Sequence, residues 1–241
     1  LEASFAMRPL SATFLGDHRF DDQLDDISAA ARARWLAHDR DTLATLEQRF
    51  GTAAAGKLSA DDALDYRIFR DDLLRSIWLT ENFHPFADDP RVYGGYLSDS
   101  VYSLVAQSTL PKETNVANAI ARIRQLPRIV AEAKATLTTP PASVLATAIG
   151  QNRGAISFYK QDLFTLVGQT EQQAELEAAA AEAVGLLEGY QQFLEDELQP
   201  RATGEWRLGR ELFAKKFELV VDMGLTADEL LAEAEAEFER V

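Results

Sequence analysis

The sequence contains no cysteine among its 241 residues. Without a thiol, the chain can form no disulfide, no thiolate nucleophile and no cysteine-ligated zinc or iron–sulfur centre. A protein without cysteine tolerates any redox environment, so this absence does not decide the compartment. Exported, periplasmic and cytoplasmic locations all stay open.

Long apolar runs and basic residues are also scarce. No stretch approaches the ~20 consecutive apolar residues that a membrane-spanning helix needs, and the mean hydropathy is -0.19. Lys and Arg number 24 against 39 Asp and Glu, which gives a formal net charge of -15. An acidic surface repels phosphates. We therefore expect no membrane span and no nucleic-acid partner.

Recognisable catalytic motifs are missing. His18, His38 and His84 do not have the paired spacing with which a helix binds zinc. The sequence has no G-x-S-x-G elbow and no glycine-rich phosphate loop. We expect the three histidines to be surface or capping residues. The residues thus predict no catalytic residue, no metal ligand and no cofactor in this chain.

What the sequence does contain is helical periodicity, since apolar residues recur every three to four positions almost throughout. Strand-like alternation is nearly absent. The pattern predicts an all-α fold with about eight or nine mostly antiparallel helices and short loops, in a single helical domain over 1–241. Helices are expected over 28–50, from 59 through 77, over 97–107, 115–137 and 141–166, up to 198, and from about 208 and 226.

Several local signals refine these helices. Pro127 should kink the helix over 115–137. Ser59 is a plausible N-cap, and the apolar stripe of the helix after it is expected to run through Leu64, Ile68, Leu74 and Ile77. Thr170 with Gln173 has the pattern of a capping box. So does Thr226 with Glu229, and the helix that it begins shows no Gly or Pro stop before Val241. We therefore expect the chain to continue in a longer protein.

An acidic run lies near the start of the chain, at Asp17, Asp21, Asp22, Asp25 and Asp26. Closely spaced carboxylates can bind calcium, but the run lacks the D-x-[DN]-x-[DN]-G loop and its terminal Glu. We interpret it as a solvated turn whose Asp side chains cap helices.

The most site-like local feature is an aromatic cluster beside two glycines, formed by Arg91, Tyr93, Tyr96 and Tyr102. A tyrosine combines an apolar ring with a hydrogen-bonding hydroxyl, which suits a ligand cleft. The same residues also suit packing between helices. Both interpretations stay open.

A second candidate is the pair Asn152 and Arg153, which interrupts the apolar stripe of its helix. An amide and a guanidinium there could face a cleft. They could equally form a hydrogen-bond network between helices.

Four blocks of sequence taken together resemble a known family. They are RPLSATFLGDHRFDDQLDDIS, DDPRVYGGY, RIRQLPRIVAEAKATLTTPPASVLATAI and LEDELQPRATGEWRLGRELFAKKF. In this order they resemble the bacterial family called domain of unknown function 885, over nearly the whole chain. Full-length members look like helical zinc metallopeptidases with an H-E-x-x-P-G-H motif in the C-terminal half. This sequence lacks that motif, so it resembles the N-terminal part.

The resemblance implies a structural role for this chain. It would be a noncatalytic helical lobe that forms one wall of a substrate cleft, with the C-terminal catalytic half as its partner, zinc held in that half and a peptide-like substrate. No catalytic or metal residue is carried over. The tyrosine cluster with Arg91, and the pair Asn152 and Arg153, are the candidates for cleft-facing residues.

Two other functions are possible. The chain could be a self-sufficient acidic helical module that binds a partner in a groove between helices. It could also be a small acidic enzyme with an unrecognised carboxylate site, although no spacing in the sequence supports that. An exposed apolar patch would favour the first reading, because a severed interface leaves such a surface uncovered.

Overall fold

The computed structural model describes residues 1–51, 58–221 and 224–240. In these residues there is no β-strand, and eight α-helices have seven or more residues. The all-α prediction is therefore confirmed. The chain divides into two compact units: unit 1 contains Leu1–Ala33 and His84–Glu205, and unit 2 contains Arg34–Phe83 and Trp206–Val241.

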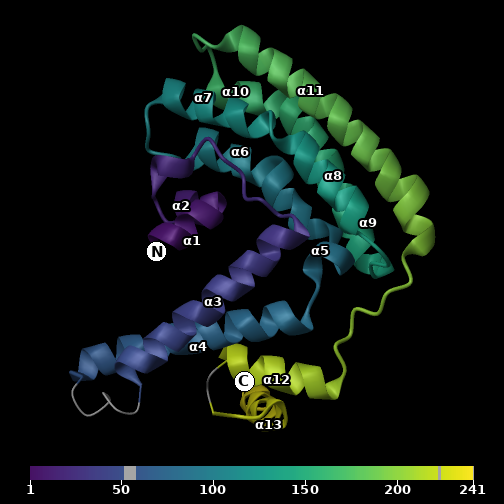
Figure 1. The fold of residues 1–241 in the computed structure, drawn as a ribbon. Helices are drawn as coiled ribbons and strands as arrows, with labels where there is room; N and C mark the ends of the chain where they lie inside the picture. Colours follow the sequence, from purple (N-terminus) through teal and green to yellow (C-terminus); the bar gives the residue numbers. More distant parts are fainter. Residues whose placement is uncertain (52–57, 222–223, 241) are drawn as a thin grey trace. The chain divides into compact units, whose positions relative to one another are not determined.

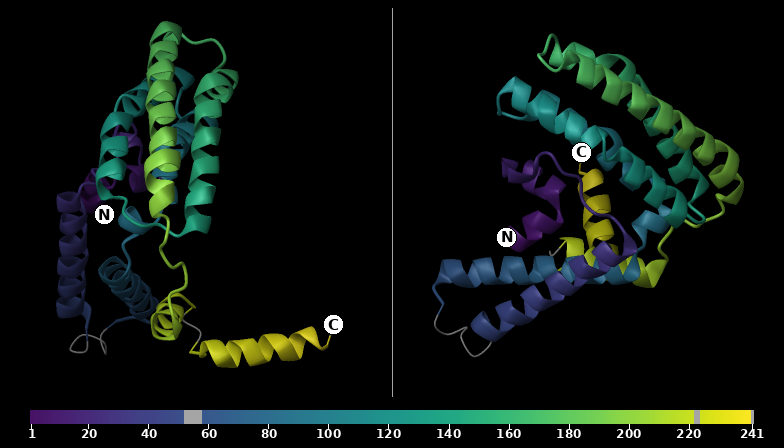
Figure 2. Two further views of the ribbon diagram at one scale, coloured as in Figure 1. Left: turned by 90° about the vertical axis from the view of Figure 1, so that its right-hand side faces the viewer. Right: turned by 45° about the horizontal axis from the view of Figure 1, so that its top comes forward.

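Unit 1 is built around four long helices. They are α7 (Lys112–Ile123), α8 (Leu126–Thr136), α9 (Ala142–Ser157) and α11 (Gln173–Gln192). The Ala-rich helix α11 packs along α7, α8 and α9 (Figures 1 and 2). Small residues on its inner face, Ala179, Ala180 and Ala183, are buried and allow this close approach. The core of unit 1 lies between these helices.

Four segments of unit 1 are wound as π-helix. Two of them, η4 (Gly95–Asp99) and η5 (Ser103–Gln107), flank α6 (Ser100–Tyr102), so that one continuous helical stretch covers the region predicted as a helix over 97–107. The others, η6 (Phe158–Asp162) and η7 (Phe193–Leu198), follow α9 and α11. A π turn is rare and is often found at functional sites.

Short helices complete unit 1. The N-terminal segment forms α1 (Glu2–Met7), α2 (Pro9–Phe14) and the 3₁₀ turn η1 (His18–Phe20). After unit 2, the chain returns through α5 (Pro85–Asp88) and η3 (Pro90–Tyr93), and α10 (Leu163–Val167) and η8 (Gln199–Arg201) follow further on. A proline opens α2, α5 and η3, where its missing N–H costs nothing.

Unit 2 contains most of α3 (Ala29–Phe50), together with α4 (Ala60–Asn82), α12 (Arg210–Val221) and α13 (Ala227–Phe238). Side chains of α3 and α4 hold each other: the Ser76 hydroxyl donates to the buried Asp39 at 2.9 Å. The Arg40 guanidinium meets Glu81 at 2.5 Å. Ser59 caps α4 by accepting the Asp62 N–H, as the sequence predicts.

Two local predictions are wrong, and a third is confirmed in part. The helix expected over 115–137 is broken rather than kinked, because α7 ends at Ile123 and Pro127 lies in the first turn of α8. Thr170 does not form a capping box with Gln173, because α11 begins at Gln173 with Gln172 as its N-cap, and the Thr170 hydroxyl accepts the Gln172 N–H and donates to Glu113. Thr226 does form the predicted box with Glu229, but α13 ends at Phe238. Residue 241, to which that helix was expected to extend, lies outside the described residues.

The two units differ in how much apolar surface they bury. Unit 1 buries large side chains such as Leu104, Leu126, Ile129 and Leu187 completely. In the described residues of unit 2, Leu73 is the one apolar side chain that is buried. The stripe predicted on α4 is covered only in part: Leu64 and Ile68 are 47% and 58% exposed, whereas Leu74 and Ile77 are half-buried.

No helix in the described part of the chain combines the length and the apolar character needed to cross a membrane.

Candidate functional site

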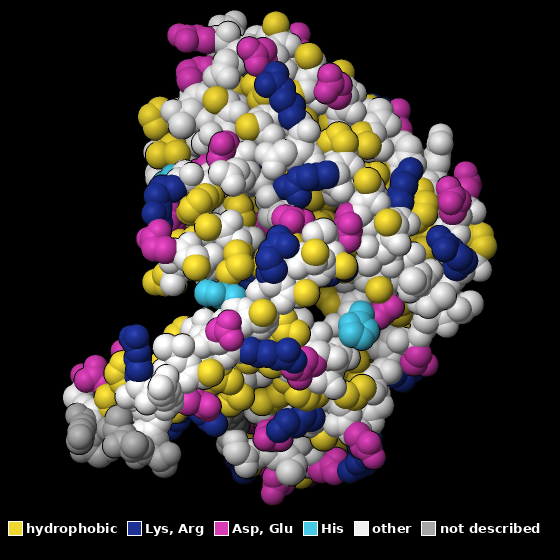
Figure 3. All heavy atoms as spheres, in the orientation of Figure 1, with side chains coloured by type: hydrophobic (Ala, Val, Ile, Leu, Met, Phe, Trp, Pro, Cys, Tyr) yellow, Lys and Arg dark blue, Asp and Glu magenta, His cyan; other side chains and the backbone are white. Residues whose placement is uncertain are grey.

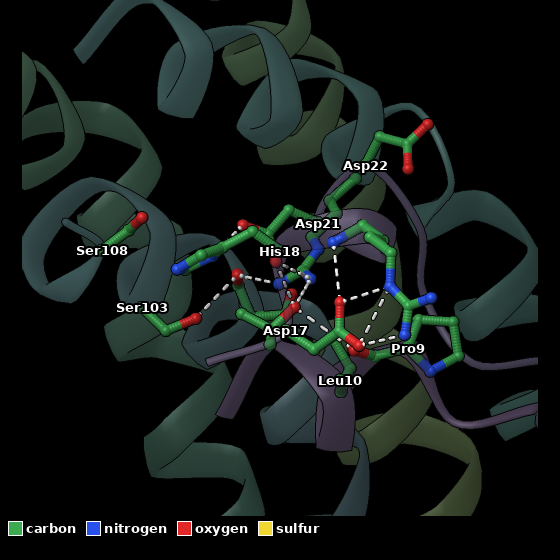
Figure 4. Close-up of polar contacts among 12 residues, drawn as sticks. Pro9, Leu10, Asp17, His18, Asp21, Asp22, Ser103 and Ser108 are labelled. Carbon is green, nitrogen blue, oxygen red and sulfur yellow. Dashed lines mark hydrogen bonds and ion pairs between the residues drawn. The ribbon is translucent and has the colours of Figure 1, made fainter. Parts of the chain in front are cut away.

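The N-terminal segment of unit 1 carries a network of charged and polar side chains (Figure 4). Asp17 caps η1 by accepting the Arg19 N–H, and its carboxylate also accepts hydrogen bonds from the Arg19 guanidinium. These bonds to Arg19 lower the pKa of Asp17 to about 2. Arg19 pairs with Glu2 as well, at 2.7 Å. The outer part of the acidic run is therefore a capping turn, as predicted.

The inner part of the acidic run is buried, which corrects the prediction of a solvated turn. Asp21 and Asp25 are 1% and 5% exposed. Asp21 lies 3.9 Å from the guanidinium of Arg122, and both side chains are completely buried. Burial lowers the pKa of Arg122 to about 10, and the charge of Asp21 opposes this shift. A buried charge needs such a partner, since it has lost its hydration.

The Thr13 hydroxyl bonds to both Asp21 and Arg122, and His18 also contacts Asp21. The Thr13 hydroxyl donates to Asp21 at 2.6 Å and accepts from Arg122 at 2.5 Å. Arg122 also donates to the carbonyl of Ser100 at 2.7 Å. The Nδ1 atom of His18 lies 2.8 Å from the other oxygen of Asp21. Four side chains from α2, η1 and α7 are thereby fixed relative to one another.

Beside this network lies a pocket of about 700 Å³, which we call the His18 pocket. Its lining includes Thr13, Phe14, His18, Asp99, Tyr102 and Ser103. The N-terminal segment forms one wall, and the stretch η4–α6–η5 forms the other (Figure 4). The π turns on both sides of α6 thus border a pocket, where such turns often occur.

A second pocket of about 480 Å³, which we call the Asp25 pocket, is lined by Asp25 and shares Leu10 and Phe14 with the His18 pocket. The Asp25 carboxylate accepts hydrogen bonds from the Leu10 N–H at 3.0 Å and from the Tyr96 hydroxyl at 3.3 Å. Burial raises the pKa of Asp25, and the two hydrogen bonds oppose the rise. A carboxyl group with a raised pKa in a pocket is a common feature of functional sites.

The structure does not bring the predicted aromatic cluster together at one site. Tyr93 is buried and donates to the carbonyl of Phe86 at 2.8 Å, which is a packing role. Tyr96 lines the Asp25 pocket, and Tyr102 lines the His18 pocket. Arg91 is exposed and its guanidinium pairs with Asp89 at 2.7 Å.

Asn152 and Arg153 lie on α9, away from both pockets. The Asn152 amide donates to the carbonyl of Leu187 at 3.0 Å and to Gln191 at 2.8 Å, while Arg153 meets Glu195 at 2.5 Å. These are contacts between helices. Asn152 also borders a small cavity of about 20 Å³. That any of these residues faces a substrate cleft stays a prediction.

Sequence reasoning missed Thr13, His18, Asp21 and Arg122 as a connected group. Arg122 was hidden among polar residues of an amphipathic helix, and nothing in its neighbours indicates burial. One signal was available: His18 and Asp21 stand three positions apart, the spacing that places two side chains on the same side of a helical turn. Their pairing to Arg122, a hundred residues away, has no local signature.

The described residues do not offer a metal centre. In 1–51, 58–221 and 224–240, no group of three or more His, Asp or Glu side chains could hold a metal ion. The zinc that the resemblance implies belongs to the catalytic half, and its presence there stays a prediction.

With this geometry established, comparison with known proteins places the chain. The family model described as "Bacterial protein of unknown function (DUF885)" matches residues 9–241. The chain belongs to this family. The resemblance found in the sequence is thereby confirmed, and it extends over essentially the whole chain.

Among solved structures, a similar one comes from Shewanella oneidensis and is described as a candidate lipoprotein of unknown function. It shares 23% sequence identity with the chain at a TM-score of 0.85, which shows that the fold is the same. The match covers 99% of this chain but 44% of that one, so the chain spans less than half the length of that similar protein. A search of curated proteins finds no match.

Proposed function

We propose that this DUF885 chain is a noncatalytic helical lobe of a longer zinc-dependent, peptidase-like hydrolase, and that it forms one wall of the substrate cleft. The remainder of that protein holds the zinc and performs the hydrolysis. The chain contributes shape and contacts to the substrate. This proposal takes its chemistry from the family resemblance and its physical support from unit 2.

One observation carries the proposal: α12 and α13 have no buried residue in the part of the chain that the structure describes. Helices of this length draw most of their stability from a buried apolar face. Burying one Leu or Phe side chain contributes about 1.5–3 kcal/mol. Two amphipathic helices with nothing buried therefore need a further partner.

The apolar side chains for such an interface are present in unit 2. Figure 3 shows hydrophobic side chains exposed among the charged ones on the face in view. Those of unit 2 that are large and exposed are Phe50, Leu64, Ile68, Phe69, Trp206, Leu212, Phe213, Val220, Leu231 and Phe238. Monomeric proteins rarely expose apolar surface on this scale without a use for it.

The proposed occupant of this surface is the rest of the same polypeptide. In the similar solved structure, more than half of the chain lies outside the part that this fold covers, because the match spans 44% of it. A second domain of comparable size is therefore available in a protein with this fold. Interfaces between domains of one chain commonly cover such surfaces.

The test compares the 241-residue chain with the longest polypeptide that its gene encodes. Hydrogen exchange would be followed at the amides of α12 and α13, and zinc would be measured by elemental analysis. We expect protection of both helices and one bound zinc in the longer protein, and neither in the chain alone. Equal protection in both samples would overturn the docking. It would favour a self-sufficient binding module instead.

A further inference from the structure

His18 is one of the residues that line the His18 pocket. Its Nδ1 lies 2.8 Å from the buried Asp21 carboxylate, which can only accept a hydrogen bond. In the neutral form of the ring, this contact places the proton on Nδ1 and leaves Nε2 with a lone pair. In the described part of the chain, Nε2 has no hydrogen-bond partner. His18 thus offers the pocket an acceptor that the Asp21 contact holds in place.

The opposite wall also offers acceptors. The Ser103 hydroxyl donates a hydrogen bond to the carbonyl of Ser100 at 3.1 Å, so its oxygen can only accept a hydrogen bond from a ligand. Asp99 is exposed, and one of its carboxylate oxygens accepts from Ser98 at 3.3 Å. The other oxygen has no partner in the described residues. An exposed carboxylate is an acceptor that also carries negative charge.

The one cation of the lining cannot meet a ligand directly. Arg122 borders the pocket, but its side chain is completely buried and Asp21 lies 3.9 Å away. Its guanidinium holds Thr13 and Ser100 in position instead. A ligand therefore meets acceptors and a negative charge, not a cation. The net charge of -15 adds a long-range attraction for positive ligands.

Two aromatic rings complete the pocket. Phe14 comes from the end of α2 and Tyr102 from α6, and both line the pocket. Their side chains are 89% and 43% exposed. Exposed rings favour an apolar group, and their faces also attract cations. The lining therefore combines acceptors for N–H donors with apolar surface beside them.

We propose that the His18 pocket binds a primary ammonium group that is attached next to an apolar side chain, with Nε2 of His18, the Ser103 hydroxyl and the Asp99 carboxylate as its acceptors. If the proposed function holds, this ligand is the free N-terminus of a peptide substrate. The site lies within unit 1, whereas the proposed function rests on the surface of unit 2. Either can therefore fail without the other.

The test measures binding to the 241-residue chain by isothermal titration calorimetry with defined probes. Phenylalanine amide carries both an ammonium group and an apolar side chain, and we expect it to bind. Its N-acetylated form lacks the charge and two N–H donors, so it should bind at least tenfold more weakly. Equal affinity for the two would overturn the proposal.

Substitutions at His18 separate the two ring nitrogens. In His18→Asn, the amide takes the place of Nδ1 and keeps the contact with Asp21, but Nε2 is lost. In His18→Gln, the amide oxygen takes the place of Nε2. We expect His18→Asn to weaken phenylalanine amide binding on the order of tenfold, which is about 1.4 kcal/mol. His18→Gln should retain more of the affinity. Unfolding curves of both variants would verify that they are folded.

Further probes identify the source of the ammonium group. Cadaverine has ammonium groups without an adjacent apolar side chain. If it binds as tightly as phenylalanine amide, the pocket takes a lysine-like amine, and the assignment to a peptide N-terminus is overturned. Binding of maltose in preference to both amines would overturn the ammonium proposal altogether. Asp99→Asn should weaken phenylalanine amide binding severalfold, and an unchanged affinity would remove Asp99 from the site.

Discussion

The guanidinium of Arg122 and the carboxylate of Asp21 lie 3.9 Å apart with both side chains fully buried, and the hydroxyl of Thr13 bonds to both. This pair connects α7 to the N-terminal segment across a hundred residues of sequence. It therefore fixes the wall that carries His18 against the helices of unit 1.

We predict that Arg122→Met destabilises the protein by about 3–5 kcal/mol, because it removes the buried cation that faces the buried Asp21 carboxylate. Urea unfolding would measure the change. Arg124→Met is a matched control from the end of the same helix, where the ion pair with Glu175 is more than half exposed. That control should cost less than about 1 kcal/mol. Adding Asp21→Asn to Arg122→Met should recover part of the loss, and no recovery would contradict the pairing.

The raised pKa of Asp25 predicts a pH dependence of stability. Burial makes the folded protein hold the Asp25 proton more tightly than the unfolded chain does. The contribution of Asp25 to stability therefore falls as the pH rises from the unfolded pKa to the folded pKa, and it stays low above that interval. Asp25→Asn should remove this component while its amide oxygen still accepts the Leu10 N–H. Unfolding curves measured from about pH 3.5, just below the ordinary Asp pKa, up to about pH 7 would show this pH dependence.

Asp17→Asn serves as the control, because the pKa of Asp17 is shifted in the opposite direction to that of Asp25. The Arg19 hydrogen bonds lower the pKa of Asp17 to about 2. Its contribution to stability is therefore present above the unfolded pKa and is lost as the pH falls toward the folded value. If the stability of the Asp25→Asn variant changes with pH in the same way as that of the unsubstituted protein, this result would contradict the burial of Asp25.

Two glycines should respond to alanine in opposite directions. At Gly204, a Cβ would lie 2.2 Å from the backbone oxygen of Thr139, so Gly204→Ala must displace main chain and should destabilise the protein. At Gly185, in the exposed middle of α11, a Cβ meets nothing within 4 Å. Gly185→Ala should therefore stabilise the protein by about 0.5–1 kcal/mol. Thermal midpoints of both variants would test this contrast.

The exposed face of α12 predicts an effect that depends on the rest of the protein. Phe213 is 49% exposed, so Phe213→Ser should change the stability of the 241-residue chain by less than about 0.5 kcal/mol. In the longer protein, the same substitution should cost more, because there Phe213 is buried in the proposed interface. Denaturant midpoints of the two forms give the comparison, with the surface substitution Lys215→Ser as a control. Equal changes in both forms would argue against the interface.

The sequence predicted the helices better than it predicted what they bury. The Ser59 N-cap and the Thr226 capping box are local devices, and both were found where expected. Thr170 has the same local pattern, but its hydroxyl donates to Glu113 of a distant helix and accepts the Gln172 N–H, and α11 begins only at Gln173. Local spacing cannot reveal a competing partner that comes from a distant helix.

The same limit applies to the candidate site. Tyr96 and Tyr102 were found from their local grouping, and each does line a pocket. Asp25, which lines the pocket of Tyr96, belongs to a run that was interpreted as solvated, and His18, which lines the pocket of Tyr102, was expected to be a surface or capping residue. Burial of a carboxylate depends on what packs over it, and here the neighbours are α2 and α7. No pattern within the run itself carries that information.

The π turns at η4 and η5 have a consequence for comparison among relatives. Because each hydrogen bond in a π turn spans five residues instead of four, such a turn holds one residue more than an α turn. A relative that lacks either turn would be shorter by a single residue there, and every following side chain would rotate by about 100° around the helix axis. A one-residue gap in an alignment at 95–99 would thus mark a protein in which Ser103 no longer points into the pocket. Insertions and deletions of this kind could change which ligand the pocket binds without any change of fold.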